Sequence, residues 1–276
     1  MCTLVTENKP AALTQMDQYV RRMFGVPIYA LTMKQMMQVI DETIRSRSQL
    51  LIGVVNAAKV VNMRRDPSLR DAVLASNLIL ADGMSVVWAS RLLGEPLPER
   101  VTGVDLMMRM LELANERGYR IYCLGATQEV LETVMQRIAE LFPNARLAGS
   151  HHGYFSQENE LRLADEIAAA EPDMLFVAMS PPKKEIFLAR WARQMNVPVS
   201  HGVGGAFDIL AGKTRRAPRI WQKLGMEWLY RVCQEPRRMW RRYLVTNTLF
   251  CGIVLSELVR RFWFRLNPRK INHTHD

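Results

Sequence analysis

The chain has 276 residues, of which 49% are hydrophobic, and it carries a formal net charge of +10. This length and composition are typical of a globular protein with one large α/β domain and exclude an intrinsically disordered chain. The four cysteines have no CxxC spacing, so neither a zinc site nor a disulfide framework is expected, and the N-terminus lacks the charged and then apolar pattern of a signal peptide.

Alternating strand and helix patterns follow a leader that we expect to be flexible over residues 1–20. Buried strands are expected at 50–55, 78–81, 120–124, 174–178 and 197–203, and helices at 85–93, 104–117, 129–141, 158–170 and 184–194. This alternation predicts an α/β core over residues 21–212, with a mostly parallel sheet and helices on both of its faces.

Candidate ligand-binding residues lie where the predicted strands end, which is where ligands bind in such folds. Asn56 follows the first strand, and Asp82-Gly83 follows the second. Asp82 can accept a proton from a substrate, although Asp at this position also serves simply as a turn or helix cap. Gly125 ends the third strand and either admits a ligand to the backbone or makes a plain tight turn.

The most glycine-dense segment is 202–208, after the fifth predicted strand. Three glycines among four residues can expose backbone N–H groups to a diphosphate. Phe207 stands where a dinucleotide-binding fingerprint needs glycine, and the chain has no Walker-type phosphate loop. Asp208 either faces a ligand or hydrogen-bonds its own loop.

A metal site is not expected, because the sequence has no Asp-x-Asp pair and its histidines lack spaced carboxylate partners. No cofactor is expected either. A departing diphosphate would then be stabilised by arginine, lysine and backbone N–H groups, in a metal-independent reaction.

The positive charge is concentrated in residues 213–276, which contain fifteen Lys and Arg residues against four acidic residues. We expect this segment to form a basic, amphipathic helical appendage. Its apolar run 244–259 is short and polar for a membrane span, while the neighbouring Arg, Trp and Phe residues favour a helix lying on an anionic membrane surface. A helix packed on the core is the alternative.

Seven segments together resemble the WecG/TagA/CpsF family of inverting glycosyltransferases, with the match running from about residue 24 to about residue 243. The segments are 56–59, 81–87, 100–106, 182–185, 202–208, 216–218 and 224–231. The resemblance implies a Rossmann-like core, a UDP-sugar donor, and a polyprenyl diphosphate-linked sugar acceptor at the cytoplasmic face of the bacterial inner membrane, where the protein would be peripheral and would assemble cell-surface polysaccharide.

The resemblance also assigns roles to residues. It implies that Asp82 is the catalytic base and that three appendage arginines reach over the site, namely Arg231, Arg238 and Arg241. The expected donor-binding residues are Asn56, Gly83, Arg100, Thr102, Gly125, Lys184, Gly204, Gly205 and Asp208. Family members often carry Gln at the position of Lys184 and some carry Thr at that of Val54, so the donor is left open among N-acetylmannosamine, its uronic acid and glucose.

Two functions of other classes also fit parts of the sequence. A nucleic-acid-binding protein would explain the basic tail, although no recognised binding motif accompanies it and we expect no nucleic-acid partner. A nicotinamide-dependent oxidoreductase would explain the α/β core. The oligomeric state is left open by the sequence, which is compatible with a homo-oligomer.

Overall fold

The computed structural model describes residues 10–223, 225–234 and 236–266, without the side chains of residues 219, 223, 231, 237–239, 241, 242 and 264–266. Six parallel strands form the central sheet, in the order β4-β3-β8-β7-β5-β6. The strands are β3 (Leu50–Val55), β4 (Leu78–Ala81), β5 (Arg120–Gly125), β6 (Arg146–His151), β7 (Met174–Ala178) and β8 (Val199–Gly202). The expected Rossmann-like α/β fold is confirmed.

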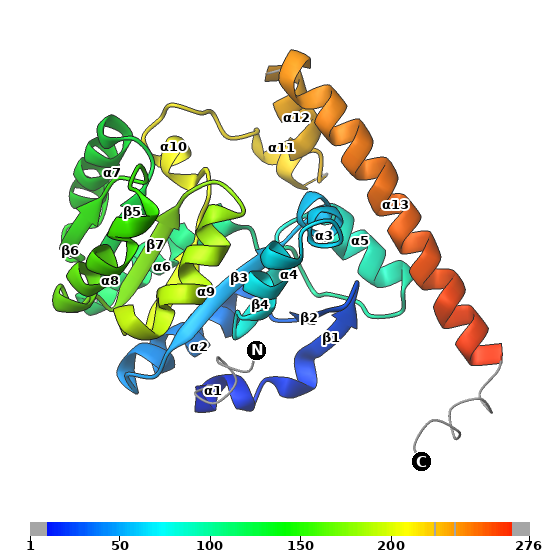
Figure 1. Ribbon diagram of the computed structural model, residues 1–276, viewed down its shortest axis with the longest axis horizontal. Coiled ribbons are helices and arrows are strands. Elements are labelled where there is room, and N and C mark those ends of the chain that lie inside the picture. Colours follow the sequence, from blue (N-terminus) through cyan, green and yellow to red (C-terminus); the bar gives the residue numbers. More distant parts are fainter. Residues whose placement is uncertain (1–9, 224, 235, 267–276) are drawn as a thin grey trace.

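Helices cover both faces of the sheet (Figure 1). One face packs on α2 (Met33–Arg45), α6 (Gly103–Arg117) and α7 (Gln128–Leu141), and the other on α8 (Glu160–Ala169) and α9 (Lys183–Met195). The strands alternate between these cores, because Leu50 and Ile52 face one and Leu51 the other. The remaining helices of the core are α3 (Ala57–Met63), α4 (Pro67–Leu74), α5 (Met84–Leu92) and α10 (Ala206–Leu210).

We expected a flexible leader over residues 1–20, of which residues 1–9 lie outside the described residues. From residue 10 onward the N-terminal segment packs on the core. Leu13, in the short helix α1 (Ala11–Thr14), is fully buried, because it completes the apolar cluster around α2. The turn Asp17–Tyr19 follows, and then the antiparallel hairpin of β1 (Val20–Met23) and β2 (Val26–Tyr29), which lies beside β4.

The C-terminal segment forms α11 (Arg219–Lys223), α12 (Glu227–Gln234) and the long α13 (Pro236–Leu266). α13 begins at Pro236 and runs along one side of the molecule (Figure 1), where it packs on α3. Phe250, Ile253 and Val254 are buried in the same apolar cluster as α3 and β2. This helix therefore shares a hydrophobic cluster with the core, and the division of the chain at residues 212 and 213 stays a prediction.

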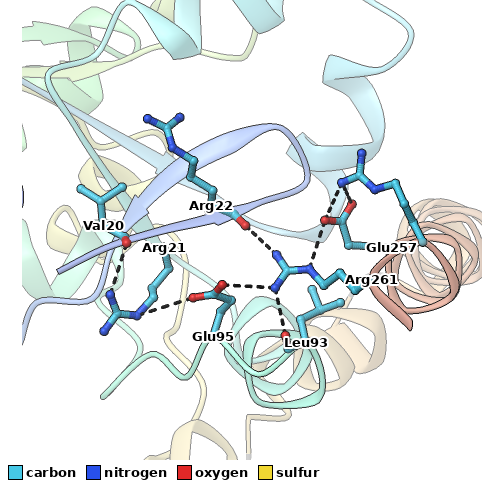
Figure 2. Close-up of polar contacts among 8 residues, drawn as sticks. Val20, Arg21, Arg22, Leu93, Glu95, Glu257 and Arg261 are labelled. Carbon is cyan, nitrogen blue, oxygen red and sulfur yellow. Dashed lines mark hydrogen bonds and ion pairs between the residues drawn. The ribbon is translucent and has the colours of Figure 1, made fainter. Parts of the chain in front are cut away.

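An arginine fastens the end of α13 to the N-terminal hairpin (Figure 2). Arg261 donates hydrogen bonds to the carbonyl oxygens of Arg22, at 2.7 Å, and Leu93, at 3.0 Å, and pairs with Glu95 at 3.2 Å. On α13 itself, Glu257 is 7% exposed and pairs with Arg260 and Arg261. By length and composition alone, Tyr243–Trp263 within α13 is a candidate membrane span, longer than the run 244–259 noted in the sequence.

Candidate active site

The candidate site lies at the carboxyl edge of the sheet, where β3 and β8 are neighbours. The chain passes from β3 outward to β4 and then crosses to β5 on the far side of β8, so the strand order reverses between β3 and β8. Such a reversal opens a crevice in parallel sheets. Asn56 follows β3, Asp82 follows β4 and the glycine segment 202–205 ends β8, so the topology brings these three sequence-predicted groups to one edge.

Asp82 is held in a turn that supports its negative charge. Its backbone N–H donates to the carbonyl oxygen of Val55 at 2.9 Å, and its Oδ1 accepts from the N–H of Gly103 at 3.2 Å. Gly103 is the first residue of the 15-residue helix α6, and the hydroxyl of Thr102 caps this helix by accepting from the N–H of Asp105 at 3.0 Å. A helix N-terminus favours a carboxylate in its ionised form.

Asn56 and Gly83 shape the same turn. The Oδ1 of Asn56 accepts from the N–H of Lys59 at 3.0 Å and so caps α3, while Gly83 is the cap residue of α5. A Cβ at Gly83 would lie 3.4 Å from the Cβ of Asn56, so the two strand ends approach closely here. Donor binding by both residues stays a prediction.

The expected glycines differ in what surrounds them. A Cβ at Gly204, which has φ of +55°, or at Gly205 would meet no atom within 4 Å, so their backbone faces open space. Gly125, with φ of +126°, is different, because a Cβ there would lie 2.3 Å from the carbonyl oxygen of Ala178. Glycine is therefore needed at Gly125 for strand packing, whereas at Gly204 and Gly205 a ligand has access to the backbone.

Lys184 and Asp208 occupy unlike surroundings. The Lys184 side chain is 7% exposed, runs over Gly202, and ends 2.9 Å from Oε1 of Glu185. Asp208 lies half-buried in the first turn of α10. Their contacts with a donor stay a prediction, as does the sequence-based role of Thr102, which in this structure caps α6.

Arg100 belongs to a set of four charged side chains that joins the appendage to the core, which we call the clasp: Arg100, Asp105, Arg216 and Glu227. Arg100 pairs with Glu227 of α12 at 2.7 Å, and Arg216 pairs with Asp105 at 2.6 Å and with Glu227 at 3.6 Å. Although burial opposes it, hydrogen bonds from Arg216 and Thr102 lower the pKa of Asp105. The clasp thus docks α12 beside the helix N-terminus that holds Asp82.

The three predicted appendage arginines cannot be placed in the same way. Arg231 lies in α12, and Arg238 and Arg241 lie in α13, but their side chains are outside the described part of the structure. Their role over the site stays a prediction. Within the described ranges, no group of three or more His, Cys, Asp or Glu residues is arranged to hold a metal ion.

Comparison of the sequence with known protein families gives a match that covers most of the chain. Residues 21–263 match the model of the glycosyl transferase WecG/TagA/CpsF family. The chain belongs to this family. The resemblance read from seven short segments is thereby confirmed.

Curated relatives in this family are 34 to 38% identical to the chain over the aligned residues. A relative from Bacillus spizizenii is 38% identical over 188 residues, which cover 68% of this chain and 72% of the relative. One from Bacillus subtilis is 35% identical over 81% of this chain and 86% of the relative. One from Staphylococcus aureus is 34% identical over 79% of this chain and 85% of the relative. All three are named N-acetylglucosaminyldiphosphoundecaprenol N-acetyl-beta-D-mannosaminyltransferase.

Sequence reasoning missed three groups at this edge of the sheet. Lys59 and Glu185 form a buried ion pair, and His201 on β8 is fully buried with its Nε2 3.4 Å from the carbonyl oxygen of Gly103.

Tyr154, in the turn after β6, is 73% exposed, and the preceding Gly153 packs against Gly125. An exposed ring beside strand ends can stack on a nucleobase. Lys59 and Glu185 lie within segments 56–59 and 182–185, which carry the family resemblance. Their opposite charges were the signal in the sequence that could have indicated an ion pair.

Proposed function

We propose that this protein transfers N-acetylmannosamine from UDP-N-acetylmannosamine to a polyprenyl diphosphate-linked N-acetylglucosamine, in cell-surface polysaccharide assembly. Family membership carries the reaction class, and the names of the relatives supply the acceptor and the transferred sugar. The position of Asp82 at the carboxyl edge of the sheet, against the N-terminus of α6, is the observation that carries the mechanism.

In the proposed reaction Asp82 accepts the proton of the acceptor hydroxyl as that oxygen attacks the anomeric carbon of the donor. The bond from the anomeric carbon to the UDP oxygen breaks in the same step, so the configuration inverts and no covalent enzyme intermediate forms. The N–H of Gly103 and the dipole of α6 stabilise the carboxylate of Asp82 before the proton moves.

The diphosphate of the donor would bind over Gly204 and Gly205, whose backbone faces open space. Arg100 lies at the same edge and is positioned by Glu227. Arginine and backbone N–H groups can stabilise the negative charge that develops on the departing diphosphate. We therefore propose a reaction that needs no metal ion.

We further propose that the protein works peripherally at the cytoplasmic face of the bacterial inner membrane, on an anionic surface. A lipid-linked acceptor supports this location. So does α13, which carries exposed apolar side chains opposite its buried face; those more than half exposed are Leu244, Val245, Leu255, Val259 and Phe262. Because Phe250 and Ile253 hold the helix on the core, we favour a helix lying on the membrane over one that crosses it.

The function is tested with purified full-length protein, a short-chain polyprenyl diphosphate-linked N-acetylglucosamine, and three donors: UDP-N-acetylmannosamine, its uronic acid and UDP-glucose. We expect a disaccharide product from the first donor, with a β linkage identified by NMR. Turnover of UDP-glucose or of the uronic acid alone would contradict the proposed donor, and no product from any donor would contradict the proposed function.

Metal independence is tested in the same assay by adding a strong chelator. We expect the rate of transfer to stay within about twofold of the untreated protein, because fixed cationic and N–H groups would stabilise the leaving diphosphate. A loss of activity that one added divalent ion restores would show that a metal ion takes part.

A further inference from the structure

Three charged side chains are buried together beneath the candidate site, and we call them the lysine cluster: Lys59, Lys184 and Glu185. Lys59 comes from α3 and the other two from the start of α9, and all three are less than 9% exposed. The ammonium groups of Lys59 and Lys184 lie 2.7 and 2.9 Å from the same carboxylate oxygen, Oε1 of Glu185. The two lysines thus share one buried carboxylate.

With both lysines protonated, the lysine cluster holds two ammonium groups and one carboxylate and therefore has an excess of positive charge. Burial and the neighbouring Lys184 lower the pKa of Lys59, and the carboxylate of Glu185 opposes this lowering. Although burial acts against it, the two lysines lower the pKa of Glu185, so this carboxylate stays ionised. An unmatched charge inside a protein is costly unless another charge compensates it. The lysine cluster therefore needs an anion nearby.

Asp82 is an anion in the right place. Lys59 lies in the first turn of the helix that Asn56 caps, and Asn56 follows β3, the strand paired with the strand that Asp82 ends. Burial lowers the pKa of Lys59, and the negative charge of Asp82, like that of Glu185, opposes this lowering. The aliphatic chain of Lys184 lies against Gly202, where a Cβ would be 2.7 Å from its Cδ. The lysine cluster therefore underlies both the base and the glycine segment.

The described groups around Asp82 differ in the charge that they carry. His201 is neutral near pH 7, because burial lowers its pKa to about 4. From α6, the N–H of Gly103 contributes a dipole rather than a full charge. Arg100 is engaged with Glu227. A diphosphate arriving above 202–205 would bring further negative charge and favour protonation of Asp82, which would end its use as a base.

We propose that Lys59, together with Lys184, is a positioning residue whose buried positive charge keeps the Asp82 carboxylate ionised while a diphosphate binds above it. This inference rests on the proposed function, in which Asp82 is the base. The lysines touch neither the acceptor hydroxyl nor the reacting carbon in this scheme. They act through Asp82, and Glu185 holds both ammonium groups in place.

The inference is tested by the pH dependence of kcat/KM, whose acidic limb reports the pKa of the base in the free enzyme. Lys59→Met removes a cation near Asp82, so we expect the acidic limb to move up by about 0.5 to 1 pH unit. Glu185→Gln breaks the same ion pair but removes an anion, so the limb should move down or stay. A purely structural role would lower the rate in both variants without moving the limb.

A third variant covers the case in which Lys59→Met fails to fold, as judged by circular dichroism. Lys184→Gln also removes one cation and leaves the pair of Lys59 and Glu185 intact, and it too should move the acidic limb up. An acidic limb that stays in place in the folded lysine variants, or one that moves up in Glu185→Gln as well, would overturn the inference.

A direct titration separates this inference from the proposed function. The carboxyl carbon of Asp82 can be followed by NMR in protein labelled with 13C-aspartate, with Asp82→Asn providing the assignment. We expect the same upward shift in the pKa of Asp82 in the lysine variants. If the wild-type chain transfers no sugar but this shift occurs, the electrostatic inference stands and the proposed function fails; an unchanged pKa overturns the inference whatever the activity.

Discussion

At the residue scale, Asp82 owes its chemistry to its surroundings. One of its oxygens accepts from the first N–H of α6. In our proposal, the buried charge of Lys59 also favours its ionised form. An isolated carboxylate on a strand end would have neither this hydrogen bond nor a buried cation nearby. In the proposed mechanism, this arrangement would favour the ionised carboxylate that a general base requires.

Replacing Asp82 by asparagine tests this role. Asp82→Asn keeps the shape of the side chain and an oxygen that accepts from Gly103, so we expect a normal fold and unchanged UDP affinity. Transfer should fall about 10²- to 10⁴-fold, the usual contribution of a general base. UDP binding is measured by calorimetry and transfer by product formation. Turnover within a few-fold of wild type would remove Asp82 from the role of base.

His201 makes a second prediction, which concerns stability. Burial lowers its pKa to about 4, from an ordinary value of 6.5. Between these values the unfolded chain binds a proton that the folded chain does not, so the free energy of unfolding decreases as the pH falls from 6.5 to 4. The full contribution is up to about 3 kcal/mol. Urea unfolding at several pH values measures it.

The variant His201→Gln provides the comparison for this prediction. Glutamine keeps an N–H group that can donate toward the carbonyl oxygen of Gly103 but does not titrate. Carboxylates lose their charge over the same pH range in both proteins, so only the difference between the two curves reports the histidine. Parallel curves would show that His201 does not lower stability in acid.

At the scale of elements, apolar runs predicted the buried strands well. Three of the five strands have the expected bounds, because β3, β4 and β7 are covered on both faces and are almost entirely apolar. β6 was missed because it lies at the edge of the sheet, and its side chains are exposed or half-buried. The hairpin β1–β2 was missed for a similar reason, since Arg21 and Arg22 interrupt its first strand.

The site was predictable only in part, for a reason that lies in the topology. Asn56 and Asp82 follow neighbouring strands, so the position of each at a strand end indicated a shared edge. The pair of Lys59 and Glu185 joins residues 126 positions apart on two helices. Only the strand order brings these helices together, and periodicity along the sequence does not reveal strand order.

The clasp gives a prediction for α12. Glu227→Gln removes the charge that holds both Arg100 and Arg216, so α11 and α12 should detach more often from the core. We expect amide hydrogen exchange in residues 225–234 to become about fivefold faster, as the loss of about 1 kcal/mol implies. Transfer should fall, because Arg100 would lose its orientation.

An exposed ion pair elsewhere provides the matched control. Arg162 and Glu166 pair on α8 with side chains 75% and 47% exposed, and exposed pairs contribute little to stability. Glu166→Gln should therefore change neither exchange in α12 nor transfer. Equal effects of the two substitutions would show that the clasp has no special role in docking α12.

At the scale of the whole molecule, α13 has two different faces. One face is part of the core through Phe250, Ile253 and Val254, and Arg261 fastens its end to the hairpin (Figure 2). The other face exposes large apolar side chains, and the segment from residue 213 onward carries the excess positive charge of the chain. A helix with this division can rest on an anionic bilayer while it stays packed on the catalytic core.

The two faces can be separated by substitution on the same helix. Leu255 and Val259 are 62% and 59% exposed, so changing both to serine should leave stability nearly unchanged. If this face inserts into the headgroup region, the loss of two apolar side chains should weaken binding to phosphatidylglycerol vesicles about tenfold or more.

Ile253→Ala, on the buried face, should instead lower the free energy of unfolding by about 2 kcal/mol or more and leave vesicle binding by the folded protein unchanged. Vesicle sedimentation and urea unfolding measure the two quantities. Full vesicle binding by the Leu255→Ser, Val259→Ser protein would show that α13 does not dock on the membrane through this face, and the basic residues alone would then have to account for any attraction to the bilayer.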